Sequence, residues 1–270
     1  MSNNNYTFWQ LINKHRIEIP PIQRDYAMGR DNTKAEDIRD TFIQKIKETL
    51  DTNEANQLHL NFIYGKIEGK KDEHKIKENK KAIESMLYAV KSYSHNLELD
   101  IDFSVIETEA KINGTPDTVF IPLDGQQILT RLVLLHLYII QKLEPNQRPD
   151  DYGNILSNFT YRIRPSSKDF CKALIDNNIK FSQEKLSDEI TDTYWFRTSW
   201  LKDPTVSGML NMLDVIHEKI GRKNQQDFNN YWIALTENRR ISFEFLDLDQ
   251  LNQTDELYIK MNARGKPLTE

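Results

Sequence analysis

The sequence predicts an α+β protein in which a small mixed sheet is joined to a large helical portion. The strongest observation is residues 119–140, where a β-branched and aromatic run, a tight turn and a long apolar run follow one another. Residues 97–105 alternate apolar and polar side chains, which is typical of a half-buried strand. Residues 188–237 carry apolar side chains at helical spacing, and these predict a helical core.

The N-terminal part alternates helices and extended segments. A helix is expected at residues 6–14, and residues 17–22 must be extended because they contain Pro20 and Pro21. A second helix is expected at residues 34–50, and a strand at residues 58–67. In that strand Gly65 indicates a bulge or a close backbone approach. In the second helix the side chains at helical spacing are Ile38, Phe42, Ile46 and Leu50.

Residues 119–140 form the central strand, turn and helix of the prediction. Asp124 and Gly125 make the turn, and the helix that follows is apolar on most faces, so it must be buried. Asp124 is expected to cap the helix, while the amides of Gly125, Gln126 and Gln127 attract anions, phosphates above all. An ordinary capped core helix is the alternative. The pair of glutamines at the mouth of an apolar element favours a binding site.

The C-terminal half is mainly helical. An acid- and proline-rich segment after Lys142 divides the chain into an α/β part at residues 1–142, a helical part at 143–240 and a return to the sheet at 241–270. Residues 159–164 predict a short strand, followed by a helix capped by Ser166 or Ser167. Further helices are expected at residues 188–201, 205–219 and 228–237. Thr269 suits the cap of a helix beyond residue 270, so we expect a longer protein.

Composition limits the function classes. The net charge of −5 excludes a chain coated in basic surface, but not a local basic groove. A single cysteine, Cys171, and a polar N-terminus without an apolar signal segment predict a cytoplasmic protein. The six histidines show no metal-ligand spacing, and neither a GxxxxGK[ST] loop nor a nuclease motif is present. The sequence therefore leaves the metal ligands unknown.

Three separated motifs carry a resemblance to a known family. They are IPPIQRDYAMGR at residues 19–30, PLDGQQILTRL at 122–132 and LYIKMNARGKPLTE at 257–270. These are similar to the IPxxQRxYxW, DGQQRLTTL and NxRGxxL motifs of the ParB/sulfiredoxin-like N-terminal domain of GmrSD-type restriction enzymes, long a domain of unknown function. The resemblance implies a small mixed sheet of ParB/sulfiredoxin type. The chain departs from the signature at Ile128, where the family has Arg, and at Arg131, where it has Thr.

The resemblance also implies a function. It implies a cytoplasmic regulatory domain that binds and hydrolyses a nucleoside triphosphate with Mg²⁺, in a restriction or phage-defence protein whose HNH nuclease region follows. The expected partners are this nucleotide and, through the full-length protein, DNA, but no membrane. With Ile128 in place of Arg, the expected NTPase activity is weakened. The implied catalytic residues are Asp124 and Gln127, and the implied nucleotide-binding residues are Gln23, Arg24, Tyr26, Gly125, Gln126, Thr130, Arg131, Asn262 and Arg264.

Two other interpretations stay open. The first is a DNA-binding specificity module that uses the same cationic loops on backbone phosphates without hydrolysis. The second is a structural interaction domain, which the convergence of polar motifs disfavours. The resemblance disfavours reductase chemistry, because the sulfiredoxin branch of the fold uses a cysteine in its central loop, where this chain has residues 124–127.

Overall fold

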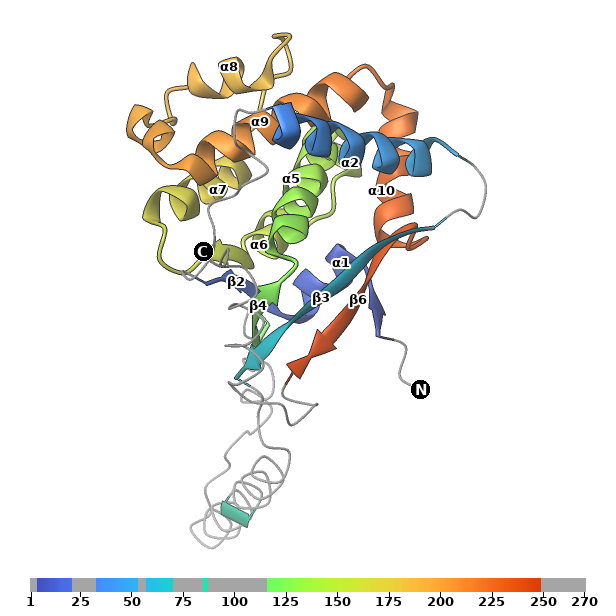
Figure 1. Ribbon diagram of the computed structural model, residues 1–270, viewed down its shortest axis with the longest axis vertical. Helices are drawn as coiled ribbons and strands as arrows, with labels where there is room; N and C mark the ends of the chain where they lie inside the picture. Colours follow the sequence, from blue (N-terminus) through green and yellow to red (C-terminus); the bar gives the residue numbers. More distant parts are fainter. Residues whose placement is uncertain (1–3, 21–32, 53–56, 70–84, 87–115, 249–270) are drawn as a thin grey trace, which may run out of the picture.

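The computed structural model describes residues 4–20, 33–52, 57–69, 85–86 and 116–248. Within them a mixed sheet lies against a group of helices, so the predicted α+β class is confirmed (Figure 1). The strands are β1 (Asn5–Tyr6), β2 (Arg16–Ile19), β3 (Leu58–Glu68), β4 (Val119–Asp124), β5 (Phe159–Tyr161) and β6 (Ile241–Asp247). The α-helices are α1 (Phe8–Lys14), α2 (Thr33–Asp51), α5 (Gln126–Lys142), α6 (Tyr152–Leu156), α7 (Pro165–Asp176), α8 (Leu186–Thr191), α9 (Pro204–Ile220) and α10 (Gln225–Thr236).

The six described strands form one sheet in the order β1-β6-β3-β4-β2-β5. β3 runs antiparallel to β4 and parallel to β6, while β2 is parallel to both β4 and β5. β6 joins the sheet, as predicted for this segment, and its neighbours there are β1 and β3. The register between β3 and β4 shifts between Tyr64 and Gly65. A Cβ on Gly65 would lie 2.2 Å from the Ile121 carbonyl oxygen, which confirms the predicted bulge and close approach.

Helix α5 leaves the end of β4 and runs into the helical part of the molecule (Figure 1). It contacts α1, α9 and α10, and every residue from Leu129 to Gln141 is buried. The prediction of a helix buried on most sides is therefore confirmed. One apolar core includes side chains from the sheet, from α5 and from α9, such as Phe120, Tyr138 and Met212. No helix among the described ranges is long and apolar enough to cross a membrane.

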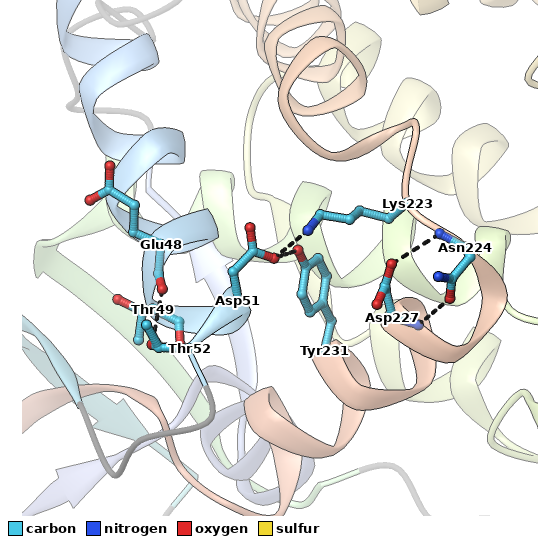
Figure 2. A network of polar contacts seen from close by, with 8 residues as sticks. All are labelled: Glu48, Thr49, Asp51, Thr52, Lys223, Asn224, Asp227 and Tyr231. Carbon is cyan, nitrogen blue, oxygen red and sulfur yellow. Dashed lines mark hydrogen bonds and ion pairs between the residues drawn. The ribbon is translucent and has the colours of Figure 1, made fainter.

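Polar contacts join the end of α2 to α10 and to the loop before it (Figure 2). Asp51 accepts hydrogen bonds from the Tyr231 hydroxyl and from the Lys223 ammonium group, the latter at 2.6 Å. Asn224 and Asp227 form a capping box that begins α10. Burial alone raises the pKa of Asp51, but the hydrogen bonds from Lys223 and Tyr231 and the charges of Lys223 and Lys47 bring it below its ordinary value.

Two predictions for the C-terminal helices are wrong in detail. The helix expected at residues 188–201 ends at Thr191, and residues 198–202 form a short 3-10 helix, η3 (Thr198–Lys202). The Thr191 and Thr193 hydroxyls donate to backbone carbonyls of α8, which favours its end there. Helix α7 begins at Pro165 without a serine cap, because proline suits the first helical position; Ser167 donates to Asp203 instead.

The buried face of α2 is displaced from the predicted one. Ile38 is 37 % exposed, while its neighbour Arg39 is 4 % exposed. Apolar spacing alone could not reveal a buried arginine. The strand expected at residues 97–105 lies outside the described residues, and the division of the chain at residues 142 and 240 stays a prediction.

Candidate functional site

Gly125 sets the geometry of the turn between β4 and α5. It is the N-cap of α5 and has a left-handed backbone with φ 86°. A Cβ there would lie 2.7 Å from the Cγ1 atom of Ile63 on β3. Only glycine therefore fits both the backbone conformation and the available space. This close approach fixes the start of α5 against the sheet.

Asp124 does not cap α5, so that prediction is wrong. It is still the last residue of β4, one position before the N-cap. Its Oδ1 atom accepts the Gly125 N–H at 2.7 Å, and its carboxylate accepts the hydroxyl of Tyr64, the residue opposite it on β3. Burial, followed by the charge of Asp124, raises the pKa of Tyr64. Asp124 remains exposed beside the start of the helix.

Gln126 has a structural role at the first helical position. Its side-chain amide donates to the carbonyl oxygens of Pro122 at 2.8 Å and Leu123 at 3.3 Å. These bonds tie the first turn of α5 to the strand that precedes it. The Nε2 group of the side chain is therefore engaged in holding the turn together.

Gln127 carries an unsatisfied acceptor. Its Oε1 atom is buried and has no hydrogen-bond partner in the described part of the chain. No side chain caps the helix, and within the same residues the N–H groups of Gln126, Gln127 and Ile128 meet no acceptor. Unpaired donors at the positive end of a long helix attract anions. The first turn of α5 thus offers three donors, with the Asp124 carboxylate beside it.

Side chains of the second turn of α5 contact other elements of the protein. The Thr130 hydroxyl lies 3.0 Å from the Tyr161 hydroxyl of β5, and both groups are buried. The Arg131 guanidinium is 4.2 Å from the centre of the Phe42 ring on α2, a cation–π contact. Arg39, nearly one turn before Phe42, is also buried. Two guanidinium groups therefore lie under the surface near this helix.

Ile128 occupies the position of the signature arginine. It is partly buried and packs against the hydrophobic core. An apolar side chain is satisfied there by packing alone, without a charged partner. Arg131 is buried over Phe42, so its charge lies between α5 and α2.

Five predicted site residues lie outside the described residues: Gln23, Arg24, Tyr26, Asn262 and Arg264. The structure brings together Asp124, Gly125, Gln126 and Gln127 at one turn. Sequence reasoning missed Tyr64 and Arg39. The signal for Tyr64 was its place before Gly65, whose predicted close approach brings β3 against β4. For Arg39 there was no comparable signal. Among the described residues no group of three or more His, Cys, Asp or Glu side chains could hold a metal ion.

Comparison with known proteins assigns the chain to a family. Residues 8–270 match the GmrSD restriction endonuclease N-terminal domain. No curated protein and no solved structure matches the chain significantly. The matched region contains all three motifs and the turn at the start of α5. The chain therefore belongs to the family of GmrSD restriction endonuclease N-terminal domains, which is a family of restriction and phage defence.

Proposed function

We propose that this domain binds a nucleoside triphosphate, together with Mg²⁺, at the start of α5, and that it regulates restriction of foreign DNA. The observation that carries the proposal is the uncapped first turn of α5, where three backbone N–H groups and the buried Gln127 Oε1 atom have no partner among the described residues. Helix starts of this kind bind phosphate groups. Family membership supports the restriction context.

The surrounding residues fit a phosphate with a divalent cation. Asp124 is an exposed carboxylate at the same turn, suited to holding Mg²⁺ or orienting a water molecule. The Tyr64 hydroxyl donates to Asp124 from the neighbouring strand β3. The unpartnered Gln127 Oε1 atom would accept a hydrogen bond from an N–H or O–H group of the bound nucleotide. By resemblance, Arg24 and Arg264 would supply the cationic groups that neutralise the phosphates.

Hydrolysis is expected to be slow in this proposal. The signature arginine, which would stabilise charge developing on the phosphate, is replaced by Ile128. Losing one such electrostatic contact costs roughly a hundredfold to a thousandfold in rate. Binding suffers less, because the backbone donors of the helix start remain.

The test is a titration of the chain with the four ribonucleoside triphosphates and Mg²⁺, following both binding and phosphate release. Gln127→Leu removes the unpartnered oxygen while nearly keeping the side-chain volume, and we expect it to weaken binding about tenfold. The control is Gln226→Leu, at the second position of α10. The start of that helix is already capped by the side chains of a capping box. Equal nucleotide affinity in the two variants would contradict the proposal.

A DNA-binding module without hydrolysis is the second candidate, and the loss of the signature arginine at Ile128 favours it. The same backbone donors would then contact backbone phosphates of DNA. DNA affinity that falls steeply with salt, without nucleotide binding or phosphate release, would support this function over the first.

A further inference from the structure

A hollow of about 630 Å³ lies at the β1 edge of the sheet, away from the start of α5. It is formed by β1, by α1 and by the turn between α10 and β6. In the sheet order β1 is separated from β4 by β6 and β3, so the hollow and the α5 turn are different places. The residues that line it are Asn5, Tyr6, Gln10, Asn13, Lys14 and Arg239.

The hollow is positively charged. Lys14 and Arg239 line it, and among the described residues no acidic side chain does. The Lys14 ammonium group donates to the Tyr6 hydroxyl at 2.9 Å. Because this hydroxyl is neutral, the charge of Lys14 stays uncompensated. Arg239 is exposed and has no hydrogen bond or ion pair with any described residue. Glu244, which pairs with Asn5 across β1 and β6, does not line the hollow.

Asn5 adds an unsatisfied acceptor to this site. Its Oδ1 atom is buried and has no partner within the described residues. A buried carbonyl oxygen without a donor is unfavourable, so a ligand with an N–H or O–H group would be stabilised there. The neighbouring Asn13 amide donates to the Trp9 carbonyl at 2.7 Å and retains a second hydrogen for a ligand. The hollow therefore presents both cations and amide groups.

Arg239 is held in an unusual backbone conformation. Its φ is 51°, in the left-handed region, in the turn between α10 and β6. The Arg240 N–H donates to the Ala234 carbonyl at 3.0 Å. Glycine adopts a left-handed backbone more easily than arginine does. Strained positions of this kind cluster at ligand sites. Here the strain places a cationic residue, where glycine would be easier, beside the hollow.

We propose that this hollow binds a phosphate ester, with Lys14 and Arg239 contacting the phosphate and Asn5 accepting from a hydroxyl or amino group of the ester. Two cations favour a dianionic terminal phosphate, and the volume is larger than a single anion needs. A free mononucleotide and the 5′-phosphate end of a nucleic-acid strand share this chemistry. The site goes beyond the proposed function, because it uses none of the residues at the start of α5.

The experiment compares Arg239→Gly and Lys14→Ala with Arg222→Ala in the full chain. Arg239→Gly removes the cation and suits the left-handed backbone, so the fold is preserved. Arg222 is an exposed arginine elsewhere and serves as the charge-matched control. The probe is 5′-AMP, with adenosine as its dephosphorylated control, followed by NMR at the side-chain amide of Asn13. We expect both variants at the hollow to weaken 5′-AMP binding roughly tenfold, and Arg222→Ala to leave it unchanged.

Further binding measurements identify the source of the phosphate and distinguish this site from the one at the start of α5. The hollow is assigned to strand ends if a short single strand with a 5′-phosphate binds more tightly than 5′-AMP and the same strand without the phosphate does not. It is assigned to free nucleotides if 5′-AMP binds more tightly than the phosphorylated strand. Gln127→Leu should leave the Asn13 response unchanged, whatever it does at α5. The proposal is overturned if Arg239→Gly and Lys14→Ala bind 5′-AMP as tightly as Arg222→Ala does, or if adenosine binds equally well.

Discussion

Single residues decide the geometry of the α5 turn. Gly125 is required twice, by its φ of 86° and by the nearness of Ile63. Gln127 is the residue whose buried oxygen lacks a partner in the described structure. Asp124 was expected to be the N-cap of α5, but the N-cap is the next residue, Gly125. At this scale the chemistry depends on a few atoms, and each can be tested by substitution.

Gly125→Ala should lower the free energy of unfolding by about 2 to 4 kcal/mol, because alanine is strained in a left-handed backbone and its Cβ would be forced against Ile63. Denaturant unfolding measures this loss. Gly153→Ala is the control, because a Cβ there would meet only Ile175 at 3.9 Å. An equal effect at both glycines would contradict the assigned role of Gly125.

Ile128→Arg should restore phosphate release about a hundredfold or more if the signature arginine acts on the transferred phosphate. Arg131→Ala is the comparison, because its guanidinium lies over Phe42 on the adjacent helix. Turnover that is unchanged by the first substitution and abolished by the second would mean that Arg131 has taken over the charge. No change in turnover or affinity from either would argue against a phosphate site.

His136 predicts a pH dependence of stability. It is buried against Phe8 and stacked near Trp9, and burial lowers its pKa to about 4 despite a hydrogen bond to the Leu132 carbonyl. The unfolded chain binds this proton near pH 6.5 and the folded chain does not, so stability falls as the pH drops from about 6.5 to about 4. The loss is about 3 kcal/mol by the size of the shift.

Unfolding by urea at several pH values tests this prediction. His136→Leu should flatten the fall in stability between about pH 6.5 and pH 4. His59→Leu, which removes a surface histidine, should leave the fall in place. An unchanged pH dependence in His136→Leu would show that the proton is bound elsewhere.

At the scale of elements, the sequence predicted the parts that periodicity determines. The strand at β4, the buried helix α5 and the return of β6 follow from β-branched runs and apolar spacing. Helix ends were predicted less well, because they depend on single hydrogen bonds. Thr191 and Thr193 end α8 early, and Pro165 begins α7. The contact between Tyr64 and Asp124 required knowledge of the strand register, which periodicity does not contain.

The junction of α2 with α10 carries its own prediction (Figure 2). Tyr231→Phe removes the hydroxyl that donates to Asp51 and should cost about 1 kcal/mol of unfolding free energy at neutral pH. The lowered pKa of Asp51 makes its contribution fully present above about pH 4 and lost as the pH falls further, so the cost should shrink in acid. Tyr194→Phe, at a side chain 95 % exposed, is the control. A cost that stays constant down to low pH would contradict the hydrogen bond.

At the scale of the whole molecule, α5 connects the sheet to the helical part. Its first turn lies at β4, its middle is buried by neighbouring helices, and one apolar core extends through both parts. The candidate phosphate site is therefore at the junction of the two, on a helix that is held on all sides. Such a site is positioned rigidly, as recognition of a small anion by backbone donors requires.

The central claim is that the first turn of α5 binds the phosphates of a nucleotide. The most direct measurement is the NMR response of the backbone amides of Gln126, Gln127 and Ile128 when a nucleoside triphosphate and Mg²⁺ are added to the full chain. We predict saturable downfield shifts of these amide protons, while the capped start of α10 at residues 225–227 does not respond. Saturable nucleotide binding that leaves the three α5 amides unshifted would contradict the claim.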